Sequence, residues 1–254
     1  MSESSEGLRR LWNSSIGPKI VMGLTGVIGV GFVLVHMIGN LQIYLGAEVF
    51  NSYAQFLQGT PEILWPARIT LLTAVLLHIA AAVRLTRLNW AARPHAYAAA
   101  RKYGHTSYAA LFMRGSGVVL LAFIVFHILH FTVGAVQPAE YDVHEVLKNG
   151  LWHYEGNHEL IKTLPAELVR HDAHRMFIRG FQSPIVAAAY VVATLLLGSH
   201  LRHGVSSMIA TLGMGTGRAR LLAERAGTSV AALVTLGNLS FPIAVQAGLL
   251  TLTT

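Results

Sequence analysis

Five long apolar stretches constrain the fold of this chain more than any other feature. They cover roughly residues 20–40, 63–84, 114–136, 184–203 and 228–252. Each has about the 20 mostly apolar residues that an α-helix needs to cross a bilayer. A hydrophobic fraction of 53% with only 12% charged residues excludes an ordinary soluble domain. The sequence therefore predicts an all-α integral membrane bundle, a single domain over residues 1–254 with five transmembrane helices in the lipid bilayer.

Basic residues near the helix ends predict the orientation of these helices. If the N-terminus is cytoplasmic, that side holds thirteen of the 19 Lys and Arg residues against three Glu. The opposite side holds six basic residues against nine acidic ones. Because an excess of Lys and Arg marks cytoplasmic loops, we expect the N-terminus inside and the C-terminus outside, in the cell inner (cytoplasmic) membrane. The net charge of +7 then reflects this asymmetry, and no nucleic-acid partner is expected.

The segments outside the apolar stretches differ in length and charge. The N-terminal "MSESSEGLRRLWNSS" lacks the short apolar core and cleavage site of a signal peptide, so we expect the first helix to be retained. The outer loop 137–183 contains "PAELVRHDAHRMFIRGF", with a proline start and a glycine stop. This pattern predicts a surface helix over about 165–180, whose His171 and His174 face water or lipid headgroups.

Histidine is the main candidate for metal chemistry. The chain has no cysteine, which excludes disulfides, thiolate metal sites and haem attached covalently through C-x-x-C-H. A metal must therefore be held by nitrogen or oxygen. Six of the 13 histidines lie in or at the ends of the predicted membrane helices, namely His36, His78, His127, His130, His200 and His203.

These histidines fall into two layers when helix direction is taken into account. His36 and the pair His127/His130 come late in helices that run outward, whereas His78 and the pair His200/His203 come late in helices that run inward. Two facing histidines in each layer could supply the two axial imidazoles of a b-type haem. Depth alone does not choose between His127 and His130, or between His200 and His203.

A proton-coupled transporter with a histidine chain is the alternative from another functional class, and a divalent metal site is a third. A transporter would be expected to carry membrane-embedded carboxylates or broken helices. The predicted helices have no Asp or Glu in mid-membrane, which favours the haem interpretation.

Four motifs carry a resemblance to a known family. They are "HMIGN" (36–40), "LLHIAAAVR" (76–84), "RGSGVVLLAFIVFHILH" (114–130), and "HRMFIRGFQSP" with "LLLGSHLRHGVSSMIATLG" between 174 and 213. With them, nearly the whole chain resembles the cytochrome b membrane-anchor subunit of succinate:quinone oxidoreductases and fumarate reductases, in its single-subunit, five-helix, dihaem form.

The resemblance implies which histidines bind haem. His36 and His127 would ligate an outer haem b, and His78 and His200 an inner one. His130 and His203 then become neighbours of the ligands or quinone-site candidates. Trp65 and Arg68, in a polar cluster at the expected outer membrane edge, are further candidates for the wall of a quinone site.

The resemblance also implies partners and a reaction. A flavoprotein subunit and an iron–sulfur subunit on the cytoplasmic face would interconvert succinate and fumarate, and this chain would exchange their electrons with quinone, expected to be menaquinone. It would have no dicarboxylate active site. Some relatives carry a glutamate, proposed to move protons, where this chain has Gly198. A cytochrome b subunit of a nitrate reductase or hydrogenase is the runner-up.

Overall fold

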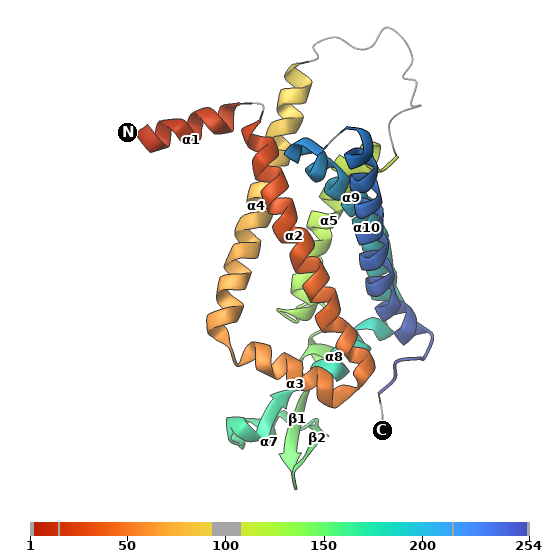
Figure 1. Cartoon of the computed structure of the whole chain (residues 1–254). Coiled ribbons are helices and arrows are strands. Elements are labelled where there is room, and N and C mark those ends of the chain that lie inside the picture. Colours follow the sequence, from red (N-terminus) through yellow and green to blue (C-terminus); the bar gives the residue numbers. More distant parts are fainter. Residues whose placement is uncertain (1–2, 15, 93–107, 215, 253–254) are drawn as a thin grey trace. The chain divides into compact units, whose positions relative to one another are not determined.

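The computed structural model describes residues 3–14, 16–92, 108–214 and 216–252 (Figure 1). Within these ranges, five helices are long and apolar enough to cross a membrane. The prediction of an all-α, multi-pass membrane protein is confirmed. The centre of the basic connection between the second and third helices, 93–107, lies outside the described residues. The five helices are α2 (Gly17–Leu41, continued by the 3-10 turn η1, Gln42–Leu45), α4 (Pro61–Ala91), α5 (Tyr108–Phe131), α9 (Pro184–Ile209) and α10 (Gly217–Gln246).

Two of these helices end earlier than the hydropathy pattern predicts. α5 stops at Phe131 rather than near 136, because Gly134 adopts a positive φ of 76° and turns the chain. α10 covers 217–246 rather than 228–252. Its start lies before the apolar run, among residues that favour helix, and Gly248 with φ of 71° follows its end. Apolar content therefore located the spans, whereas glycine turns set their ends.

Shorter elements complete the described fold. A 3-10 turn, η2, covers Ala166–Leu168, and a π-helical turn, η3, covers Ala210–Met214. The helices are α1 (Glu3–Asn13), α3 (Ala47–Gln58), α6 (Pro138–Tyr141), α7 (His158–Thr163) and α8 (Ala173–Gln182), and the strands are β1 (His144–Lys148), β2 (Leu151–Glu155) and β3 (Val169–His171).

The three strands form a small antiparallel sheet in the order β2-β1-β3, which the sequence analysis did not predict. Asn149 and Gly150 both have positive φ, 54° and 79°, as a two-residue hairpin turn requires. The surface helix is also shorter than expected. Val169–His171 pairs with β1, and the Asp172 side chain accepts a hydrogen bond from the Arg175 N–H, so α8 begins only at Ala173.

The chain groups into two compact units. The first contains residues 1–34, 65–114 and 199–232, and the second contains 35–64, 115–198 and 233–254. Each of the five membrane helices contributes residues to both units. The sequence predicts a single domain, whereas the contacts between residues group the chain into these two units.

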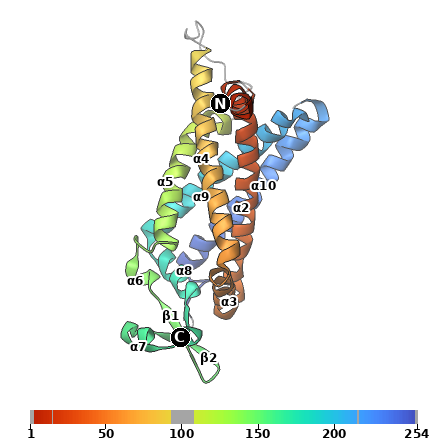
Figure 2. The same cartoon turned by 90° about the vertical axis from the view of Figure 1, so that its left-hand side faces the viewer.

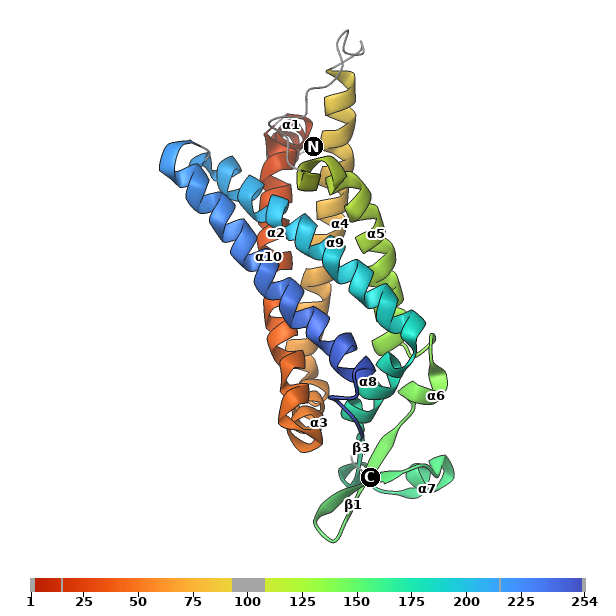
Figure 3. The same ribbon diagram turned by 90° about the vertical axis from the view of Figure 1, so that its right-hand side faces the viewer.

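α9 and α10 form an antiparallel pair (Figure 3). In the first unit a Cβ on Gly227 would lie 2.6 Å from the Arg202 carbonyl oxygen. In the second unit a Cβ on Gly198 would collide with the Thr235 hydroxyl. Glycine therefore permits the close approach of the two helices at both places.

The second unit has a dense aromatic core. α3 and α8 pack against each other and bury Phe50, Phe177, Ile178 and Phe181 together with Tyr190 of α9. The sheet and α7 lie beside one another in the same unit (Figure 2). Tyr190 of this core contacts two of the candidate histidines, His127 and His130.

Candidate functional site

The second unit brings His36 of α2 and His127 of α5 together. Their ring centroids are 5.8 Å apart, with the ring planes nearly perpendicular at 89°. His36 is exposed and His127 is half-buried. These are the two histidines that the resemblance assigns to the outer haem.

A chain of hydrogen bonds determines which nitrogen of His127 carries its proton. His127 Nδ1 lies 3.1 Å from the Tyr190 hydroxyl, which lies 2.9 Å from His130 Nδ1. His130 Nε2 is 2.6 Å from Gln137 Oε1, an acceptor. A neutral His130 donates from Nε2 to Gln137 and so accepts from Tyr190 at Nδ1. Tyr190 then accepts from His127 Nδ1–H, which leaves the lone pair of His127 on Nε2.

These hydrogen bonds distinguish His127 from His130, which the sequence spacing did not. Both ring nitrogens of His130 are engaged in hydrogen bonds, whereas Nε2 of His127 keeps a lone pair. Metal-ligating histidines ordinarily have their other ring nitrogen hydrogen-bonded in this way. The arrangement supports His127 as the ligand and His130 as a residue that acts through Tyr190.

The first unit brings His78 of α4 and His200 of α9 together, with ring centroids 6.5 Å apart. His78 Nδ1 lies 3.0 Å from the Thr25 hydroxyl of α2. The Thr25 hydroxyl hydrogen points to the Val21 carbonyl at 2.7 Å, so its oxygen accepts from His78 Nδ1–H. The lone pair of His78 is therefore on Nε2. A Cβ on Gly26 would lie 3.9 Å from the His78 ring, so this ring faces backbone at that side.

Both ring separations fit one metal ion between two imidazoles. A metal–nitrogen bond of about 2.0 Å and a distance of about 1.1 Å from that nitrogen to the ring centre put each axial ring centre about 3.1 Å from the metal. Two axial rings on opposite sides of the metal therefore have their centres about 6.2 Å apart. The observed separations of 5.8 and 6.5 Å lie on either side of this value. The separation of the two rings in each pair is thus compatible with one metal ion between them.

The remaining quinone candidates lie in the first unit, apart from His130. Trp65 and Arg68 are exposed near the start of α4, and the Arg68 guanidinium lies 5.3 Å from the Trp65 ring centre. This cation–π pair resembles an interfacial aromatic with a basic residue that reaches the headgroups. His203 lies on α9, three residues after His200, and is half-buried.

A buried ion network joins α3 to the sheet in the second unit. The Arg170 guanidinium donates to Glu145 at 2.8 Å and to Glu48 at 2.7 Å, and its side chain is only 2% exposed. Asn51 donates to both Glu145 and Asp172 at 3.1 and 3.0 Å. The hydrogen bond from Arg170 lowers the pKa of the Glu48 carboxyl, and partial burial opposes this shift.

The expectation that His171 and His174 face water or headgroups is wrong for His174. His174 of α8 is buried, and its backbone N–H donates to Asn51 at 2.8 Å. His171 is half-buried, with its ring 5.5 Å from that of Tyr141. Burial lowers the pKa of both histidines. Residues 169–171 pair with β1 as strand β3. The sequence analysis predicted a helix there and therefore did not include this pairing.

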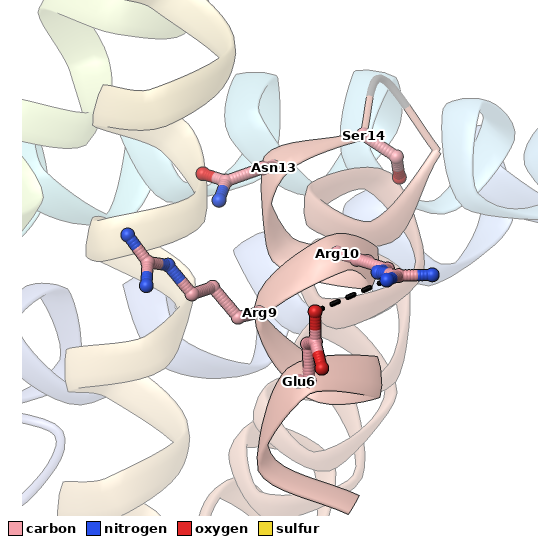
Figure 4. A pocket seen from close by; sticks show the side chains of 5 residues that line it. All are labelled: Glu6, Arg9, Arg10, Asn13 and Ser14. Carbon is pink, nitrogen blue, oxygen red and sulfur yellow. Dashed lines mark hydrogen bonds and ion pairs between the residues drawn. The ribbon is translucent and has the colours of Figure 1, made fainter. Parts of the chain in front are cut away.

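An open hollow lies beside α1, well separated in sequence from the candidate histidines (Figure 4). The side chains around it are Glu6, Arg9, Arg10, Asn13 and Ser14. Glu6 and Arg10 form an exposed ion pair at 3.1 Å. No candidate ligand lines this hollow, so it is not the predicted site.

The sequence analysis missed the three residues that orient the histidines, namely Thr25, Gln137 and Tyr190. Thr25 and Tyr190 are polar residues within apolar helices, a signal that the sequence contains but that has many structural explanations. Gln137 lies outside the helix that carries its partner. Comparisons of the chain with protein-family models, curated protein sequences and solved structures found no significant match.

Proposed function

We propose that this chain is the dihaem cytochrome b membrane subunit of a respiratory succinate dehydrogenase or fumarate reductase. One observation carries the proposal: each compact unit holds one histidine pair at the separation of two axial imidazoles. In each pair, one histidine has its Nδ1 hydrogen-bonded to a hydroxyl, which leaves its Nε2 lone pair available to a metal.

In this proposal His36 and His127 hold one haem b, and His78 and His200 hold the other. A bis-histidine haem takes up and releases single electrons. The protein residues orient the imidazoles. The Tyr190 and Thr25 hydroxyl oxygens accept hydrogen bonds from the Nδ1–H groups of His127 and His78, so that neither ring can turn without losing a hydrogen bond.

The partners follow from the proposed complex. An iron–sulfur subunit, with a flavoprotein subunit behind it, docks on the cytoplasmic face, and the electrons pass to quinone in the inner membrane. The excess of basic residues on the face expected to be cytoplasmic supports docking of such a subunit. The family resemblance of the four motifs supports menaquinone as the acceptor or donor.

Trp65 and Arg68 remain candidates for a quinone site at the expected outer membrane edge, and His203 remains a candidate for contact with quinone in the inner layer. Trp65 and Arg68 are exposed, so a quinone headgroup could reach them from the bilayer. His130 is buried and hydrogen-bonded at both nitrogens, which supports a role in orienting His127 rather than direct contact with quinone.

A spectrum of the purified chain tests the proposal. We expect reduced-minus-oxidised bands of cytochrome b, two haems per chain, and complete removal of the pigment by acid acetone because no cysteine can retain it. A colourless chain, or one haem per chain, would contradict the proposal. Co-purification of a flavoprotein that oxidises succinate separates it from a nitrate reductase or hydrogenase cytochrome.

A further inference from the structure

A second cluster of metal-ligating side chains lies in the outer loop, away from the four proposed haem ligands. It consists of Asp142, His144 and His158, all in the second unit. One ligand atom from each of the three residues lies within 4.8 Å of the others. Sequence spacing did not single out these residues, because they come from three different elements.

The hairpin explains why the three residues meet. Asp142 follows α6, and His144 begins β1. The register pairs His144 with Glu155 at the end of β2, so the end of β2 lies beside the start of β1. Asn157 then caps α7 by accepting hydrogen bonds from two backbone N–H groups, which sets His158 on the first turn. Local backbone structure thus positions all three ligands.

The distances match coordination by a small divalent ion. His144 Nδ1 lies 3.5 Å from Asp142 Oδ1, and His158 Nδ1 lies 3.3 Å from Asp142 Oδ2. Two ligand atoms at about 2.0–2.1 Å from a tetrahedral Zn²⁺ are separated by about 3.3–3.4 Å. The two observed separations are close to this value, although they involve different oxygens of the Asp142 carboxylate, and the ligand atoms of His144 and His158 lie within 4.8 Å of each other.

A second observation points to a ligand. His144 Nδ1 is buried and, among the residues that the structure describes, has no hydrogen-bond partner. Its contact with Asp142 has ion-pair separation without hydrogen-bond geometry. Buried polar atoms in native proteins are nearly always satisfied, so an unsatisfied imidazole nitrogen beside a carboxylate and a second imidazole is suited to binding a cation.

We propose that Asp142, His144 and His158 bind one divalent transition-metal ion of the Zn²⁺ class. Two imidazoles and one carboxylate suit Zn²⁺ rather than Mg²⁺ or Ca²⁺, which prefer oxygen ligands alone. Three protein ligands leave the fourth position to water, consistent with exposed Asp142 and His158 side chains. The ion clamps the end of α6 to the start of α7 and closes the β1–β2 hairpin. This inference does not depend on the haem proposal.

Equilibrium dialysis of the full chain against ZnCl₂ tests the proposal. The chain is purified in detergent through a tag without histidine and is stripped with a chelator. We expect one tightly bound Zn²⁺ per chain that excess Mg²⁺ does not displace. Asp142→Asn and His158→Gln should each weaken binding at least about 100-fold, more than the loss typical of residues outside the ligand set.

His153→Gln is the matched control, because His153 lies on β2 in the same hairpin and outside the cluster. It should bind Zn²⁺ as the unchanged chain does. Zinc X-ray absorption should report two imidazoles, and one in His158→Gln. Absence of tight binding, or equal loss in His153→Gln, would overturn the proposal, as would an unaltered zinc environment in His158→Gln. Retained helical circular dichroism shows that each variant is folded.

Discussion

The two histidine pairs are held by different surroundings. His36 and His127 lie in the second unit, where Tyr190, His130 and Gln137 form a continuous hydrogen-bonded chain behind one ring. His78 and His200 lie in the first unit, where a single threonine hydroxyl on the neighbouring helix contacts His78. Similar ring separations, 5.8 and 6.5 Å, are therefore reached with different support.

The distance between two histidine rings and the hydrogen bonds that hold those rings are therefore separate features of this membrane bundle. The second unit also contains an aromatic core and a buried ion network. Packing among several elements therefore holds the segments around its histidine pair. In the first unit, the described support for His78 comes from one turn of α2.

Replacement of one proposed ligand in each unit has the largest expected effect. His36→Leu should remove or convert one haem and leave the other, and His78→Leu should do the converse. A ligand replaced by Leu leaves iron with one axial imidazole, whereas an ordinary buried histidine would lose hydrogen bonds only. Haem content per chain and redox titration measure both variants. Two unaltered low-spin haems in either variant would end the assignment for that unit.

Loss of the buried cation should unfold the second unit selectively. Arg170→Met leaves Glu145 without its ion partner, and breaking a buried pair costs about 3–5 kcal/mol. We expect the haem of His36 and His127 to be released on heating before that of His78 and His200. Arg220→Met, which breaks an exposed ion pair in the first unit, is the control and should leave the order and temperature of release unchanged.

Removal of the orienting hydroxyls compares the two supports directly. Tyr190→Phe leaves a nitrogen of His127 and one of His130 without their common partner, and should weaken haem retention about 10–100-fold. Thr25→Val should act on the other haem, and more weakly, since only His78 loses a partner. Haem transfer to apomyoglobin gives both rates. Equal effects on both haems in either variant would contradict separate supports.

Substitution of His130 distinguishes two roles for that residue. If His130 acts through Tyr190, His130→Leu should shift the midpoint potential of the haem held by His36 and His127. A direct quinone contact predicts slower quinone reduction with both potentials unchanged. Redox titration and quinone turnover of the same preparation separate these outcomes.

Mild acid should weaken the second unit, with the smallest effect of the series. Burial lowers the pKa of His174, and Arg175 adds to this while Asp172 opposes it. Below the ordinary histidine pKa of 6.5, the unfolded chain therefore binds a proton that the folded chain does not, and stability falls as pH decreases. The lowered pKa of Glu48 acts in the same direction at lower pH, because its stabilisation is lost as pH falls through the folded value. Thermal release of the second unit's haem at pH 7.5 and 5.5 measures the change, and His174→Gln should reduce it.

Much of the architecture is written in local patterns. Five apolar stretches predicted five spanning helices, because a bilayer requires about 20 apolar residues in each. Helix direction and spacing then paired His36 with His127/His130 and His78 with His200/His203. The structure brings together one histidine from each of these sets at similar ring separations.

Features that depend on residues distant in the chain were not predictable in this way. The turn Asn149-Gly150 signals a hairpin in the sequence, yet the sequence analysis assigned no strand to the outer loop. The surface helix was placed too early because β3 pairs with β1, and strand pairing is a long-range choice.

The sequence by itself determined the class of molecule and which residues could ligate a metal, since both follow from composition and helical periodicity. Tertiary structure alone decided which nitrogens of His78 and His127 take part in hydrogen bonds with hydroxyl groups. That depends on partners from other segments, as when Tyr190 of α9 lies between His127 and His130 of α5. Tertiary structure likewise created the cluster of Asp142, His144 and His158, because only the closed hairpin returns His158 to the strand that begins at His144.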